Sequence, residues 1–221
     1  MKAIYSLLMV SLFAFGCTNP NKSSNQEAQI QENTDSIEVY EAQIQPLNSN
    51  VTNLQTSGKA RFVIDEDKMH VTIDIKNAPP GIEHWQHFHG FPNEEVAICA
   101  TKAEDANEDG VIDVVETEMV SGTTMVPFNK FPAEMNIPTD TYPVADDNGS
   151  YYYEIEIPLD DLNSAFAEAF GGSGLKLDSR VIYIHGVPSD TNLPETVASI
   201  GDIPAHVTLP IACGKIERVE E

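Results

Sequence analysis

Apolar and polar residues alternate with a period of two through much of this chain from about residue 55. The segments Lys59–Asp65 and Met69–Ile75 follow this pattern, and the polar link 66–68 between them predicts a hairpin. Further segments of the same kind, separated by turn residues, are His84–Phe91, Thr123–Phe128, Tyr151–Ile157, Arg180–His185 and His206–Ile216. Many short strands separated by turns predict an antiparallel β-sandwich or barrel.

A single segment of this region has the features of a helix. Asp160–Phe170 begins with two adjacent carboxylates, which suit a helix N-terminus, and ends at Gly171-Gly172. We place this helix inside a connection between strands. The predicted fold is therefore an all-β antiparallel barrel or sandwich with one short helix.

The N-terminus has the form of an export signal. Within residues 1–17, Lys2 precedes an apolar run that is too short to span a bilayer core of ~30 Å, and the run ends at Gly16-Cys17. This ending resembles a lipobox, so we predict a lipoprotein signal peptide whose Cys17 is acylated and becomes the mature N-terminus. An ordinary signal peptide with a coincidental cysteine is the alternative.

The region after Cys17 differs in composition from the rest of the chain. Residues 18–50 are rich in Asn, Ser, Gln and Glu and show no clear periodicity, so they bury too little apolar surface to offset the entropy of ordering. We predict a flexible linker over residues 18–54 and a folded domain over 55–221. A first strand or a short helix over Ile37–Leu47 is the alternative.

The charge balance restricts the partners of the chain. Asp and Glu number 35 against 12 Lys and Arg among 221 residues, which gives a net charge of -23. Such a surface repels nucleic acid, so we expect no nucleic-acid partner and membrane contact only through the lipid. We expect the protein in the cell envelope, lipid-anchored on the periplasmic or outer-surface side of a membrane. If Cys17 is lipidated, Cys99 and Cys213 remain, and two cysteines can pair in such an oxidising compartment.

Three of the six histidines lie close together, as His84, His87 and His89. Side chains alternate faces along a strand, so His87 and His89 point the same way, about 7 Å apart. Two such imidazoles can bind one metal ion, and imidazole pairs suit copper, zinc, nickel or iron. His84 points to the opposite face, where a structural role fits better. Each histidine taken alone is also consistent with a hydrogen-bonded core residue.

Further residues of the same chemistry occur later in the chain. His185 ends the apolar run 181–185, and His206 begins the last predicted strand. Cys99 follows the histidine pair closely, and Cys213 stands in an Ala-Cys-Gly sequence near the C-terminus. The order of these residues along the chain makes the pattern more specific than the histidine pair alone, because a lone His-x-His arises by chance.

Together these residues resemble the copper/zinc superoxide dismutases, a family of Greek-key β-barrels. His84, His87, His89 and Phe91 match the family's first histidine run, except that Gly90 replaces an acidic residue. The two cysteines, together with Arg180 and His185, match later family positions, so the resemblance covers roughly residues 57–217. It implies copper ligands at His87, His89 and His185, which would also be the catalytic residues, and a disulfide between Cys99 and Cys213.

The chain also departs from this family. No histidine lies between Cys99 and His185, so the bridging ligand and the zinc site are missing, and zinc is not expected there. The family's superoxide-attracting arginine is replaced by Pro210. His206 is close in sequence and is a candidate for a fourth copper ligand.

Residues 105–116 match the 12-residue calcium loop of an EF-hand. The turn glycine is Gly110, and calcium ligands are expected at Asp105, Asn107, Asp109, Val111 through its carbonyl, Asp113 and Glu116. The flanking segments are less typical, and no second loop is present to form a pair. We therefore predict a structural calcium site; the alternative is an acidic turn that mimics the pattern.

Two functions follow from this set of residues. The first is a copper-dependent superoxide dismutase, with superoxide as the substrate. The second is a non-catalytic module that binds copper, calcium or both. A chordin-type repeat domain is a weaker alternative, which the two cysteines oppose. The sequence predicts no oligomeric state.

Overall fold

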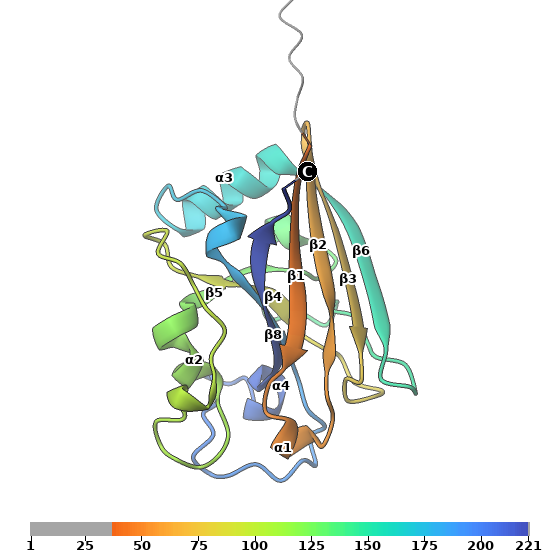
Figure 1. Ribbon diagram of the computed structural model, residues 1–221, viewed down its shortest axis with the longest axis vertical. Helices are drawn as coiled ribbons and strands as arrows, with labels where there is room; N and C mark the ends of the chain where they lie inside the picture. The colour runs from red at the N-terminus through yellow and green to blue at the C-terminus, as the bar shows by residue number, and fades with distance from the viewer. Residues whose placement is uncertain (1–36, 221) are drawn as a thin grey trace, which may run out of the picture. The chain divides into compact units, whose positions relative to one another are not determined.

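The computed structural model describes residues 37–220, and these form one curled antiparallel β-sheet with short helices at its ends and side (Figure 1). This part of the chain contains eight strands in the order β5-β4-β7-β8-β1-β2-β3-β6. They are β1 (Glu38–Pro46), β2 (Ser57–Asp65), β3 (Lys68–Lys76), β4 (Gln86–Gly90), β5 (Thr123–Pro127), β6 (Tyr151–Pro158), β7 (Val181–His185) and β8 (Pro210–Arg218). The all-β antiparallel prediction is confirmed.

The connections between distant strands give the sheet its Greek-key character. β6 returns past β4 and β5 to pair with β3, and β7 returns to pair with β4. Strand β8 then pairs with both β7 and β1, which joins the two halves of the sheet. Because β5 and β6 are the two ends of this order, the sheet is a half-barrel.

Helices within residues 37–220 are more numerous than the sequence analysis predicted. Besides α3 (Leu159–Ala169), which matches the predicted helix, they are α1 (Ser49–Thr52), α2 (Val114–Ser121) and α4 (Ala205–Thr208). Asp113 caps α2 by accepting the backbone N–H groups of Val115 and Glu116. The prediction of a single helix is therefore wrong. No helix in the described part of the chain has the length and apolar character needed to cross a membrane.

Strand β1 corrects the predicted linker boundary. Its register pairs Ala42 with Ala60 of β2 and with Ile216 of β8, so β1 is an inner strand of the sheet. Ala42 and Ile44 are fully buried in the core. The prediction of a flexible linker is wrong from Glu38 to residue 54, and the alternative of a strand near Ile37–Leu47 is confirmed. The predicted signal peptide, Cys17 and the rest of the linker lie outside the described residues.

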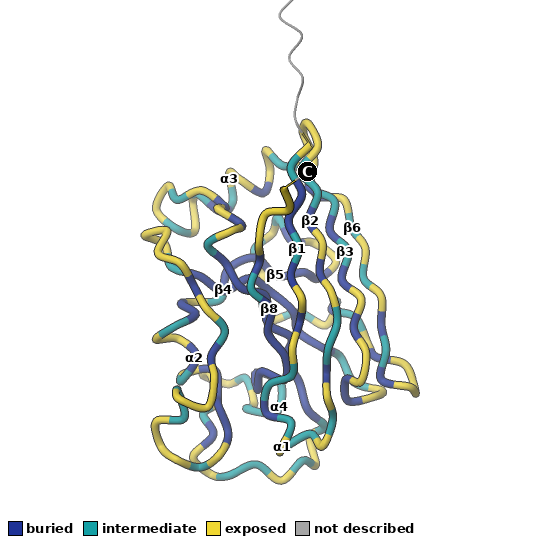
Figure 2. The backbone as a smooth tube through the Cα atoms, in the orientation of Figure 1, coloured by how far each residue is buried: buried dark blue, intermediate teal, exposed yellow. Residues whose placement is uncertain are grey.

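The two halves of the sheet differ in burial (Figure 2). In β1, β2, β3 and β6, buried and exposed positions alternate, so one face packs on the core and the other meets solvent. Strands β4 and β7 are buried at every position. The shared core is centred on Phe62, Phe88 and Phe128, whose ring centroids lie 4.7–5.6 Å apart.

The segment between β4 and α2 covers the outer face of β7 and β8. Ala97 packs against Val181, Tyr183 and Cys213. Cys99 and Cys213 form a disulfide with a Cα–Cα distance of 5.8 Å, as the family resemblance implied. This covering explains how β7 becomes buried on both faces.

Candidate metal site

Strand β4 brings two histidines to one face of the sheet. Phe88 points into the main core, so His87 and His89 on either side of it point to the opposite face. The neighbouring strand β7 pairs Tyr183 with His87, and its last residue, His185, lies on the same face. A register shift between His87 and His89 in the pairing with β5 adds a bulge at this point. Two strands therefore supply all three side chains.

The three imidazole rings form one compact group. Their ring centroids are 4.5 Å apart for His87 and His185, 5.0 Å for His87 and His89, and 5.7 Å for His89 and His185. One nitrogen of each ring lies within 4.8 Å of a nitrogen of the other two. Across residues 37–220, no other group of three or more His, Cys, Asp or Glu residues meets this criterion. The cluster can hold a metal ion.

The nitrogen atoms of this cluster are available to a metal. His185 donates its Nδ1–H to the carbonyl of Thr208 at 2.7 Å, so its Nε2 carries a lone pair. That Nε2 and the Nδ1 of His87 are buried and have no hydrogen-bond partner. His89 makes only long contacts, 3.4 Å from Nδ1 to Gly122 O and 3.3 Å from Nε2 to Thr124 Oγ1. Buried polar atoms are normally paired, so two unpaired nitrogens in one cluster indicate a missing partner.

Burial keeps these histidines neutral. It lowers the pKa of His87 well below the ordinary 6.5, and the neighbouring His185 and His89 lower it further. Burial, together with the effect of His185, lowers the pKa of His89 to about 3. Burial also lowers the pKa of His185 to about 4, although its hydrogen bond to Thr208 opposes the shift. Neutral imidazole is the form that binds metal ions.

His84 has a structural position beside this cluster. Its Nε2 lies 2.8 Å from the carbonyl of Pro79, and its Nδ1 lies 3.0 Å from the carbonyl of His185. Burial lowers the pKa of His84, and the two hydrogen bonds raise it. The ring therefore lies between the segment before β4 and the end of β7, and in its neutral form it donates its one N–H to one of these two carbonyls. This placement agrees with the structural role expected from the sequence.

The structure does not bring His206 into the cluster. His206 lies in α4, where its Nε2 donates to the carbonyl of Thr191 at 2.8 Å. The sequence pattern predicts His206 at the start of the last strand, but β8 begins only at Pro210. The expectation of a fourth copper ligand at His206 has no support in this geometry.

Arg180, which the resemblance singled out, is a buried structural cation. Its guanidinium donates to the carbonyls of Leu175 at 2.9 Å, Phe91 at 2.7 Å and Gly174 at 3.2 Å. These bonds join the start of β7 to the end of β4. Arg180 therefore fixes the two strands that carry the histidine cluster relative to each other.

A pocket of about 320 Å³ opens onto two of the ligands, His87 and His185. Its remaining lining comes from distant parts of the sequence, and the residues used below are Trp85, Val114, Ile137, Pro138, Ile200, Ile203 and Thr208. None of these seven residues was predicted from the sequence as a site residue. They come from five separate segments between the strands, so no local pattern could have identified them.

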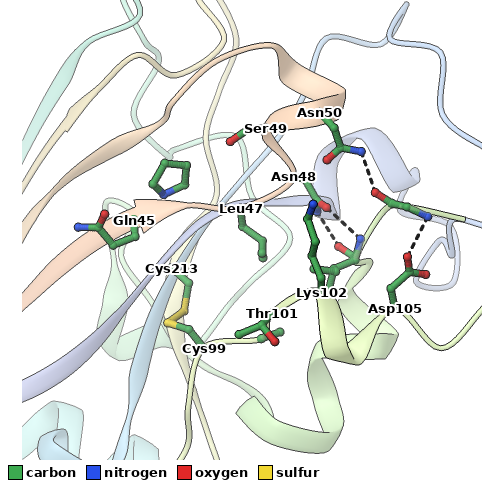
Figure 3. Close-up of a pocket in the computed structure, with 14 residues that line it drawn as sticks. Gln45, Leu47, Asn48, Ser49, Asn50, Cys99, Thr101, Lys102, Asp105 and Cys213 are labelled. Atoms are coloured by element: carbon green, nitrogen blue, oxygen red, sulfur yellow. Dashed lines mark hydrogen bonds between the residues drawn. A yellow bond between two sulfur atoms is a disulfide. The ribbon is translucent and has the colours of Figure 1, made fainter. Parts of the chain in front are cut away.

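The predicted calcium loop is held in place by hydrogen bonds from many sides. Asp105 accepts the backbone N–H groups of Asp109 and Gly110, at 3.1 and 2.9 Å. Asn50 donates to the carbonyl of Gly110 at 2.7 Å, beside the pocket that contains the disulfide (Figure 3). Asn48 both donates to and accepts from the backbone of Ile112.

Two carboxylates of this loop also hold the segment 196–203. Thr196 donates its hydroxyl to Asp109. The backbone N–H of Ala198 donates to Asp113 at 2.7 Å.

Glu116 accepts the N–H of Ala106 at 2.9 Å. In this arrangement, no three of the loop's carboxylates converge within 4.8 Å, so calcium binding by residues 105–116 stays a prediction.

The fold and site thus define a class: an antiparallel β half-barrel with a buried three-histidine cluster on its outer face, able to hold a metal ion. No protein-family model matches the chain, and no curated protein matches it.

Proposed function

We propose that this chain is a copper-binding lipoprotein of the cell envelope, with a domain similar to the copper/zinc superoxide dismutases. The single observation that carries the copper site is the pair of buried, unpartnered nitrogens, His87 Nδ1 and His185 Nε2, which lie beside His89 in one cluster. A buried polar atom without a partner is costly, and a bound metal ion would satisfy both nitrogens at once.

Three properties support copper over other metals. The donor set consists of imidazoles alone, without a carboxylate to favour calcium, magnesium or manganese. Among divalent ions of the first transition row, Cu²⁺ binds most tightly to a given nitrogen site. The order of His87, His89 and His185 in the sequence also resembles that of copper ligands in the superoxide dismutases. The lipid anchor at Cys17 rests on the lipobox resemblance alone.

The test is the metal content of the full chain after dialysis against copper, zinc and calcium together. We expect a single copper ion per chain by elemental mass spectrometry. His87→Ala and His185→Ala should lose it, because each removes an unpartnered ligand nitrogen. His70→Ala is the matched control, since His70 is on β3 and pairs with Glu154 on the sheet's exposed face.

Folding of each variant is checked by circular dichroism. If a ligand variant does not fold, nitrogen coupling in the electron paramagnetic resonance spectrum of the copper-loaded wild type still reports imidazole ligation. Copper that is absent from the wild type, or equally retained in His87→Ala and His185→Ala, would overturn the proposal.

Superoxide dismutation is the second candidate. The pocket that reaches His87 and His185 favours it, because a small substrate needs access to the metal. Bound copper would supply the change of oxidation state by which one superoxide is oxidised to dioxygen and another, with two protons, is reduced to hydrogen peroxide. No Lys or Arg lines this pocket, and the net charge of -23 repels an anion. A superoxide assay on the copper-loaded chain, with His87→Ala as the blank, decides between catalysis and copper binding alone.

A further inference from the structure

Three buried polar atoms without partners lie around one pocket. Among the described residues, the buried side-chain N and O atoms that lack a hydrogen bond are His87 Nδ1, His185 Nε2 and Thr208 Oγ1. All three residues line the pocket of about 320 Å³. A metal ion satisfies the two nitrogens, but the Thr208 hydroxyl remains without a partner. Thr208 is only 5% exposed, so its unmet hydrogen bond points to a further ligand in this pocket.

The walls of this pocket are apolar and carry no charge. Besides the three polar residues, its lining includes Trp85, Val114, Ile137, Pro138, Ile200 and Ile203. The only other polar residues in the lining are Thr123 and Thr124. Apolar walls with a few convergent polar groups are typical of small-molecule sites, and this volume suits a small ring compound.

We propose that this pocket binds an uncharged small molecule with an apolar body and a polar end, a nitrogen or oxygen donor, that is directed to the metal and to the Thr208 hydroxyl. This inference rests on the proposed metal site for the donor end of the ligand. The apolar body of the ligand is inferred from the pocket walls alone and needs no metal. Apart from the proposed metal ion, an anion finds no cation among the lining residues, and the net charge of -23 opposes its approach. An uncharged molecule avoids that repulsion and gains from burial of its apolar surface.

The probes are pyridine, 4-ethylpyridine and azide at mildly alkaline pH, where both pyridines are uncharged. Binding is followed by the fluorescence of Trp85, which is the single tryptophan of the chain and lines the pocket. The titration is done on both the copper-loaded and the metal-free full chain. We expect 4-ethylpyridine to bind roughly tenfold more tightly than pyridine in both forms, because its two extra carbons are buried against the walls. Azide should bind more weakly than 4-ethylpyridine to the copper-loaded form.

The variant Ile203→Ala removes part of the wall and should reduce the preference for the ethyl group. Val96→Ala is the matched control, because Val96 is exposed and does not line this pocket. Equal binding of the two pyridines, or tighter binding of azide, would overturn the proposal even where copper binding is normal. If the chain takes up no copper, the copper proposal fails by itself. The metal-free titration then still decides whether the pocket binds the apolar probe.

Discussion

Gly90 separates His89, the second histidine of β4 in the cluster, from Phe91, and the structure explains why this position has no side chain. A Cβ atom at Gly90 would lie 2.5 Å from Arg180 Cδ and 2.6 Å from Arg180 Nη1. The Arg180 side chain fills this space and is fixed by its three carbonyl contacts. A side chain at this position, such as the acidic residue that the resemblance would place there, would therefore clash with Arg180.

Gly90→Ala is predicted to destabilise the fold by about 1–3 kcal/mol, the usual cost of overpacking a buried position. The reason is that Arg180 cannot move without breaking its bonds to the chain. Urea unfolding of the metal-free protein measures the effect. Gly174→Ala serves as control, since a Cβ there meets no atom closer than 3.9 Å. Equal stability of the two variants would contradict this account.

The ligands differ in how far the sequence alone reveals them. His87 and His89 follow from the period of a strand, which places both on one face. His185 needed the resemblance, because only the pairing of β7 with β4 brings it to that face. No sequence pattern indicated Thr208, because its carbonyl and hydroxyl come to lie beside the cluster only in the folded chain.

The strands were predictable because half-buried strands alternate, whereas β1 was obscured by its surroundings. Strand β1 follows a long polar segment, and its own residues include Glu41, Gln43 and Gln45. These side chains alternate with buried ones, so the pattern was present but weak beside its polar neighbours. Helix α2 was missed because residues 113–116 were assigned to the calcium loop, although Asp113 also caps a helix.

Calcium is predicted to raise the melting temperature of the chain through residues 105–116. Binding to the folded state alone stabilises it by mass action, so the increase should grow with calcium concentration. Glu116→Gln should abolish the increase, because it removes the predicted bidentate ligand. Differential scanning calorimetry measures the change.

The matched control is Glu118→Gln, an exposed carboxylate of α2 outside the loop. This variant should retain the calcium response. A wild-type chain whose melting temperature ignores calcium would show that the loop is an acidic turn fixed by its own hydrogen bonds.

Across the described domain, the buried histidines are predicted to make the stability of the metal-free protein depend on pH. In the unfolded chain a histidine titrates near 6.5, whereas the folded pKa is about 3 for His89 and about 4 for His185. As pH falls below 6.5, the unfolded state therefore takes up protons that the folded state does not. The metal-free protein should lose stability from pH 6.5 down to about 4, by up to about 1.4 kcal/mol per pH unit for each such histidine.

Urea unfolding at several pH values measures this slope. His89→Gln should reduce the slope in this window, because it removes one of the groups responsible. His70→Gln is the control, since His70 is exposed on β3. The same slope in the wild type and in His89→Gln would show that other groups cause the acid sensitivity.

The segment 196–203 connects the two candidate sites of the molecule. Its first part is held by Asp109 and Asp113, and its second part supplies Ile200 and Ile203 to the pocket above the histidines. A cation that drew these two carboxylates toward itself would therefore change the hydrogen bonds that hold the segment 196–203. It would thereby change how firmly Ile200 and Ile203 are held in the pocket wall. Such a link is reciprocal. If binding of the cation changes the affinity of the pocket for its ligand by some factor, binding of that ligand changes the affinity of the loop for the cation by the same factor. The occupancy of each site would then change the affinity of the other.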